Sequence, residues 1–168
     1  MKFILAVLVM ISISIMSYCV VLLVTFNQNC AGYLKRAADA NTVETALSEL
    51  QKSTKYLEDN GLTKGYTSIV YRTPDEDIEF WYNNLKASER ELLKVDSLTS
   101  SLEKTNLLMK LRETLLDNSG KHGDTLTCPD GLSRYPHNGL LSIALVISCL
   151  SLLLGVFVIF QYLEDKFN

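Results

Sequence analysis

The stretches FILAVLVMISISIMSYCVVLLVTF, residues 3–26, and GLLSIALVISCLSLLLGVFVIFQYL, residues 139–163, decide the fold of this chain. Neither contains an Asp, Glu, Lys or Arg. A helix needs roughly 20 apolar residues to cross a bilayer core about 30 Å thick, and both stretches exceed that length. Lipid cannot satisfy free backbone N–H and C=O groups, so a spanning segment must be helical. The sequence therefore predicts two transmembrane helices that contact the lipid bilayer.

A cleaved signal peptide is the alternative interpretation of residues 3–26, because Met1 and Lys2 supply a short positive start. The apolar stretch is longer than a signal core of roughly 7–15 residues. Residues 25–29, TFNQN, are bulky or polar and offer no small-x-small cleavage site. An uncleaved anchor is the preferred interpretation.

The residues between the two stretches carry most of the charge and predict amphipathic helices. Residues 27–38 are expected to continue the first span into water. Asn41, followed by Glu44, is expected to open the next helix with a capping box, and Asn60-Gly61 to end it. Residues 62–72 are interpreted as an ordered loop rather than a strand, because no partner strand is visible.

Two more helices are expected further along the chain. Thr73, Pro74 and Glu76 match a capped helix start, and the helix is expected to run to about Val95. Another is predicted from about residue 97 to residue 117, stopped by the segment NSG at 118–120. The expected fold class is mainly α, with two transmembrane helices bracketing a small antiparallel helical bundle. The predicted division is span 3–26, helical extramembrane domain 27–117, juxtamembrane linker 118–138, span 139–163 and short tail 164–168.

The composition excludes some functions and favours none strongly. The net charge of −3 and the lack of a basic stripe argue against a nucleic-acid partner. The acidic run Asp75, Glu76, Asp77 and Glu79 is better explained by a helix N-terminus than by a metal. His122 and His137 match no zinc spacing. We expect no cofactor, no metal and no enzymatic activity.

Five aromatic residues form a candidate interaction surface: Tyr66, Tyr71, Phe80, Trp81 and Tyr82. Successive helical residues diverge by about 100°, so three consecutive aromatics cannot all face one core. Aromatic residues are favoured in interface hot spots. The alternative is that the loop 62–72 packs over the rings and hides them.

Cys30 and Cys128 flank the domain, and in an oxidising compartment they could form a disulfide above the bilayer. Two unrelated thiols are the alternative. Cys19 and Cys149 lie within the spans and are interpreted as small packing residues.

Small residues in the second span predict close helix packing. Ala144 and Ser148 are four residues apart, as are Ser151 and Gly155. The first span carries Ser12, Ser14 and Ser17. These faces are expected either to pack against each other or to drive oligomerisation. The alternative is that the small residues are ordinary sequence variation with no packing role.

Charge determines the orientation only weakly. Lys2 favours a cytoplasmic N-terminus, whereas Lys35, Arg36 and Arg134 favour a cytoplasmic domain. The flanking cysteines shift the expectation towards an external or periplasmic domain with cytoplasmic termini.

The order of span, helical domain and span resembles the sensory part of bacterial chemoreceptors. This resemblance is architectural and rests on no sequence motif. The five residues after the second span leave no room for a signalling module, so a receptor role requires a separate partner. The leading hypothesis is a non-enzymatic membrane protein whose helical domain binds a partner protein, as an accessory, assembly or scaffold subunit. The alternatives are a small oligomeric channel or permeabilising protein, and a ligand-sensing ectodomain. The expected partner is a protein or a second copy of the chain.

Overall fold

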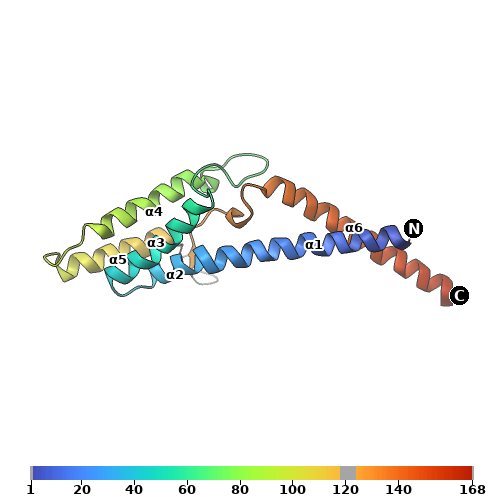
Figure 1. The fold of residues 1–168 in the computed structure, drawn as a ribbon, viewed down its shortest axis with the longest axis horizontal. Helices are drawn as coiled ribbons and strands as arrows, with labels where there is room; N and C mark the ends of the chain where they lie inside the picture. Colours follow the sequence, from blue (N-terminus) through green and yellow to red (C-terminus); the bar gives the residue numbers. More distant parts are fainter. Residues whose placement is uncertain (1, 118–123, 168) are drawn as a thin grey trace.

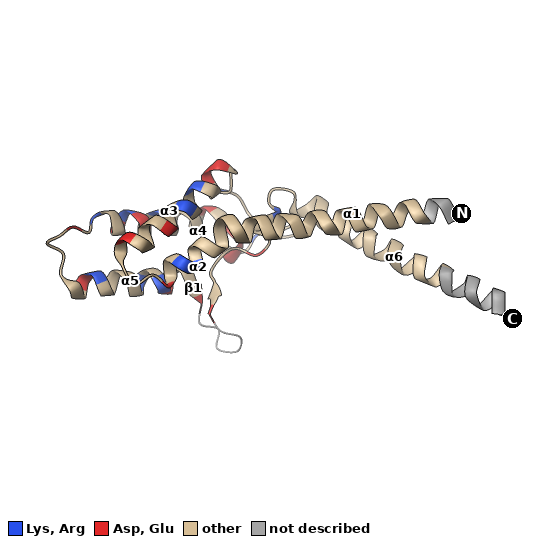
Figure 2. Cartoon of the chain, turned by 60° about the horizontal axis from the view of Figure 1, so that its bottom comes forward, with Lys and Arg blue, Asp and Glu red and all other residues tan. Residues whose placement is uncertain are grey.

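A computed structural model describes residues 2–117 and 124–167, with side chains described over 6–117 and 124–158. The chain is mainly helical and extended (Figure 1). Helices α1 (Lys2–Phe26) and α6 (Asn138–Phe167) pack against each other at one end. The other helices gather at the opposite end, where the Lys, Arg, Asp and Glu residues also lie (Figure 2).

The helices that contain α1 and α6 meet the sequence criterion for a membrane span. The segments Ala6–Ala38 and Asn138–Val158 are long and apolar enough to cross a membrane. Only 6% and 11% of their most apolar 18-residue windows are buried. A core helix of a water-soluble protein would bury most of that surface.

Helix α1 continues into the domain without a break. A π-helical turn, η1 (Asn27–Ala31), joins it to α2 (Gly32–Ala38). Residues 27–38 therefore continue the first helix, as expected. The Gly32 N–H donates to the Asn27 carbonyl, the spacing that defines a π-turn. A Cβ at Gly32 would lie 2.9 Å from the Asn27 oxygen, so the close approach requires glycine. The buried residues Cys30 and Leu34 follow on the face that meets the domain core.

Helix α3 (Val43–Asp59) packs against α2 and α4 (Ile78–Leu93), and α5 (Ser101–Leu115) contacts α2, α3 and α4. The three helices run alternately towards and away from the paired helices α1 and α6 (Figure 1). Their shared core contains the fully buried side chains of Leu34, Leu50, Leu57, Leu85 and Leu111.

Three predicted helix starts are wrong in detail. Thr42, not Asn41, caps α3: its side chain accepts a hydrogen bond from the Thr45 N–H. Thr73 opens only a 3-10 turn, η2 (Pro74–Glu76), and α4 begins after it with Asp77 as the cap. Helix α5 starts at Ser101 rather than near residue 97, because the Asp96 carboxylate accepts from the N–H groups two and three residues on and holds a turn.

The predicted loop and linker are only partly as expected. Residues 62–73 form a loop, as predicted, with an isolated bridge between Tyr66 and Asp77. The predicted stop at 118–120, together with His122, lies outside the described residues. Just before and after them, β1 (Leu116–Asp117) pairs antiparallel with β2 (Thr125–Leu126). A 3-10 turn, η3 (Leu132–Arg134), then leads to α6, and Leu132 is buried.

Candidate interaction surface

A groove with a volume of about 980 Å³ opens beside α4 and α5. Its remaining walls come from η2, from β1 and β2, and from residues 127–130. We call it the acidic groove. Among its described lining residues one carries an ammonium group, Lys110, and six carry carboxylates: Asp75, Glu76, Asp77, Glu91, Asp117 and Asp130. Both oxygens of Glu91 accept from the Lys110 ammonium at 2.9 Å, so the single positive charge is already paired.

The start of α4 fixes one wall of the acidic groove. The Asp77 carboxylate accepts from the backbone N–H groups of Glu79, at 2.9 Å, and Phe80, at 3.2 Å. The Tyr66 hydroxyl donates to the other oxygen of Asp77 at 3.3 Å. The Thr73 hydroxyl donates to Glu76 at 2.5 Å. These bonds place the predicted acidic run at a helix N-terminus, where carboxylates offset the positive end of the helix dipole.

The five predicted aromatic residues do not share one surface. Tyr71, Phe80 and Trp81 line the acidic groove. Trp81 is buried, at 7% exposure, whereas Phe80 is 65% exposed and Tyr71 is 73% exposed. Loop 62–72 therefore leaves Phe80 uncovered. An exposed aromatic beside carboxylates can contact both the stem and the charge of a basic side chain.

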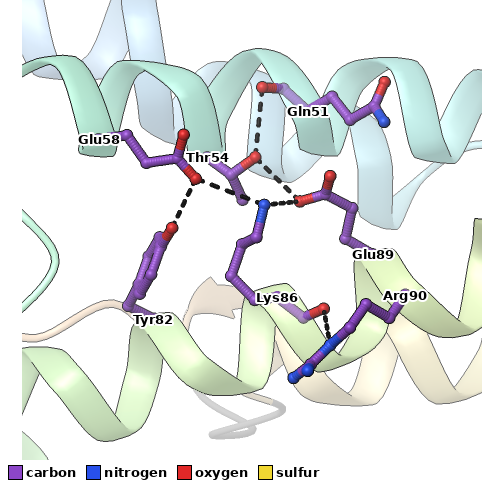
Figure 3. A network of polar contacts seen from close by, with 7 residues as sticks. All are labelled: Gln51, Thr54, Glu58, Tyr82, Lys86, Glu89 and Arg90. Carbon is purple, nitrogen blue, oxygen red and sulfur yellow. Dashed lines mark hydrogen bonds and ion pairs between the residues drawn. The ribbon is translucent and has the colours of Figure 1, made fainter.

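Tyr82 turns away from the acidic groove and towards α3 (Figure 3). Its hydroxyl donates to Glu58 at 2.6 Å. Burial raises the pKa of Tyr82 to about 12, and the bond to Glu58 adds to the rise. The same bond lowers the pKa of Glu58. This contact ties α4 to α3 and does not present Tyr82 to a partner.

The contact extends into a polar network between α3 and α4 (Figure 3). The Lys86 ammonium donates to Glu89 at 2.8 Å and lies 3.4 Å from Glu58. The Thr54 hydroxyl lies 3.2 Å from Glu89, which is buried. The bond to Glu89 raises the pKa of Lys86. Buried charges need such partners, so we interpret the network as holding the two helices in register.

Cys30 is fully buried and Cys128 is half-buried, and both carry free thiols. Burial raises the pKa of Cys30 to about 12 and also raises the pKa of Cys128. Cys30 belongs to the buried apolar core, and Cys128 packs against that core. The two cysteines, far apart in the sequence, therefore both lie at the core of the domain. Their disulfide stays a prediction.

The small residues of α6 face α1 at two points. The Ser12 and Ser151 hydroxyls are 2.7 Å apart, and the Ser151 hydroxyl donates to the Ser148 carbonyl. Ser12 and Ser148 are each 2% exposed, and Gly155 is also buried. Ala144 lines a separate apolar cleft between α1 and α6 with Tyr18.

Sequence reasoning identified one acidic segment of the groove and missed the carboxylates and the ammonium group that other segments contribute. Asp117, Asp130 and Lys110 lie in three separate segments, and only the packing of α4, α5 and the β1–β2 pair brings them together. No local spacing signals this arrangement. The described residues contain no group of three or more His, Cys, Asp and Glu side chains placed to hold a metal ion.

Comparisons with protein-family models, curated proteins and solved structures find no match to this chain.

Proposed function

We propose that this chain is a two-span, non-enzymatic membrane protein whose helical domain binds a partner protein through the acidic groove. The groove carries the proposal. It combines an excess of carboxylates with the exposed ring of Phe80. A partner segment with Lys or Arg beside an apolar side chain has the complementary chemistry, because opposite potentials favour encounter and aromatics anchor contacts.

The exposed apolar surfaces of α1 and α6 support the two spans. Large side chains such as Met10, Val20 and Leu153 are at least half exposed, which is favourable in lipid and unfavourable in water. The start of α1 and the end of α6 lie at the same end of the molecule, away from the domain (Figure 1). Both termini would then be on one side of the membrane, and we assign the domain to the external or periplasmic side.

The domain acts in this proposal as a small antiparallel bundle of α3, α4 and α5, with α2 attached. Its role is to hold the acidic groove rigid above the bilayer. Short side-chain bonds within the bundle support a rigid platform, including Tyr82 to Glu58 at 2.6 Å. Such a domain suits an accessory, assembly or scaffold subunit, because binding then requires little reorganisation.

The test compares two triple variants of the full-length, tagged chain purified from its native membranes. The groove variant carries Asp75→Asn, Asp117→Asn and Asp130→Asn. The control carries Glu44→Gln, Glu103→Gln and Glu113→Gln, which removes the same charge from exposed sites outside the lining. Each exposed carboxylate contributes up to about 1 kcal/mol, so partner affinity should fall about tenfold or more in the groove variant only.

Equal recovery of the partner with both variants would contradict the proposal, as would a monodisperse monomer with none. Capture of a second copy of the chain would identify a homo-oligomer as the partner. Circular dichroism checks that both variants remain helical.

A small organic cation is a second candidate occupant, which corresponds to a ligand-sensing domain. The volume of about 980 Å³ lies within the usual range of ligand sites, and Trp81 lines the wall. Titration of Trp81 fluorescence with a panel of amines tests it, and an unchanged spectrum throughout argues against sensing. The channel hypothesis receives less support, because the Ser12–Ser151 contact uses the small-residue face within one chain.

A further inference from the structure

The loop between α3 and α4 carries an exposed apolar tip. Ile69, Val70 and Tyr71 are consecutive, and they are 54%, 90% and 73% exposed. Three adjacent side chains of this kind in water form an unfavourable surface unless something covers them.

Hydrogen bonds hold the base of the loop in place. The Thr67 N–H donates to the Glu76 carbonyl, and the Ile78 N–H donates to the Gly65 carbonyl. Gly65 has φ of +107°, and a Cβ there would collide with the Tyr135 hydroxyl, so glycine is required at this bend. The tip is therefore presented from a fixed base.

The base is attached to the start of the second apolar helix. The buried Asn138 amide, in the first turn of α6, donates to the Thr67 carbonyl at 2.8 Å. A Cβ at Gly139 would lie 3.9 Å from Ile69 Cγ2. Figure 1 shows the loop reaching towards the beginning of α6, on the side of the domain that faces the paired helices. The apolar tip thus lies where α6 begins.

The loop that carries the tip is itself basic. Residues 62–73 contain Lys64 and Arg72 and no acidic residue, in contrast to the acidic groove. The Arg72 guanidinium lies over the Tyr66 ring at 5.0 Å, with its side chain exposed.

We propose that Ile69, Val70 and Tyr71 insert into the boundary between lipid headgroups and acyl chains, as an interfacial anchor that fixes the domain against the bilayer. Tyrosine is favoured at this depth, and the basic side chains of Lys64 and Arg72 reach lipid phosphates. The inference rests on the proposed spanning of α1 and α6. It adds a third membrane contact made by the domain itself.

The test places single tryptophans in the full-length chain, reconstituted in phosphatidylcholine–phosphatidylglycerol vesicles with acyl-chain-brominated lipid as the quencher. Val70→Trp reports the tip. Leu98→Trp is the matched control, because Leu98 is also 90% exposed but lies in the α4–α5 connection at the opposite end of the domain. Val20→Trp in α1 reports the span. Trp81 stays in place, and the emission of the parent chain is subtracted.

The expected result is a blue-shifted Val70→Trp signal, quenched about twofold or more relative to Leu98→Trp, since interfacial groups lie roughly 5–10 Å into the boundary. Quenching at Val20→Trp with none at Val70→Trp beyond the Leu98→Trp level overturns the anchor and leaves the spans intact. Absence of quenching at Val20→Trp overturns the spans and the anchor together. All three positions are exposed, so the substitutions do not disturb the core.

Discussion

At the residue scale, the helical repeat directs the side chains of neighbouring aromatic residues into different surroundings. Phe80 is 65% exposed in the acidic groove, Trp81 is buried, and Tyr82 binds Glu58 on α3. The sequence predicted that they must diverge, because successive positions turn by about 100°. It did not predict which one would be exposed, since that depends on where α3 and α5 pack.

This division predicts opposite effects for two substitutions. Phe80→Ala should weaken partner binding about tenfold and leave thermal stability unchanged, because an exposed ring contributes to recognition rather than to the core. Tyr82→Phe should lower the free energy of unfolding by about 1–3 kcal/mol and leave binding unchanged, because it removes a hydrogen bond to a carboxylate. Thermal unfolding in detergent and partner pull-down check the pair. A loss of binding in Tyr82→Phe would contradict the proposal, because it would place the interface on the side of α4 that faces α3.

The burial of the Cys30 thiol predicts that the folded domain loses stability at alkaline pH. Its folded pKa is raised from 9.0 to about 12 by burial, so the thiol binds its proton more tightly in the folded chain. The stabilisation is complete below about pH 9 and is lost as pH rises towards 12. Denaturant midpoints measured from pH 8 to pH 11 under reducing conditions should fall more steeply for the parent than for Cys30→Ala. Parallel curves would contradict the burial of this thiol.

At the element scale, periodicity predicted the helices better than their ends. The apolar repeats identified α3, α4 and α5, and Gly61, with φ of +67°, follows α3 where expected. The starts were less predictable, because several polar residues compete for each cap. Thr73 and Asp77 both precede α4, and Asp77 caps it by accepting two backbone N–H groups. Local sequence does not decide such competition, whereas the packing of the loop does.

The π-turn at the end of α1 yields an element-scale prediction. Gly32→Ala places a methyl group against the Asn27 carbonyl and should convert the π-turn to α-helix, which rotates α2 by about 100° relative to α1. Leu34 and Ala37 would leave the core, so the domain should lose about 2–5 kcal/mol of stability while α1 remains helical. Limited proteolysis checks this change. Ala31→Gly is the matched control, and resistance of Gly32→Ala equal to that of the parent would refute the role of the π-turn.

At the scale of the whole molecule, two apolar helices and a charged helical domain occupy opposite ends (Figure 2). This division was predictable, because charge is absent from residues 3–26 and 139–163. The acidic groove was not, since its carboxylates come from segments that meet only in the fold. The proposed function therefore depends most on which molecule occupies that groove.

Site-specific photo-crosslinking in native membranes tests the occupant most directly. A benzophenone side chain replaces Phe80 in the acidic groove or Leu102 on α5, outside the groove lining, where exposure is similar at 65% and 71%. If a partner protein occupies the groove, position 80 should give a discrete adduct with one protein and position 102 should give none. The adduct should be lost when Asp75, Asp117 and Asp130 are changed to Asn. Equal crosslinking from both positions, or an adduct unaffected by those three changes, would contradict the proposed function.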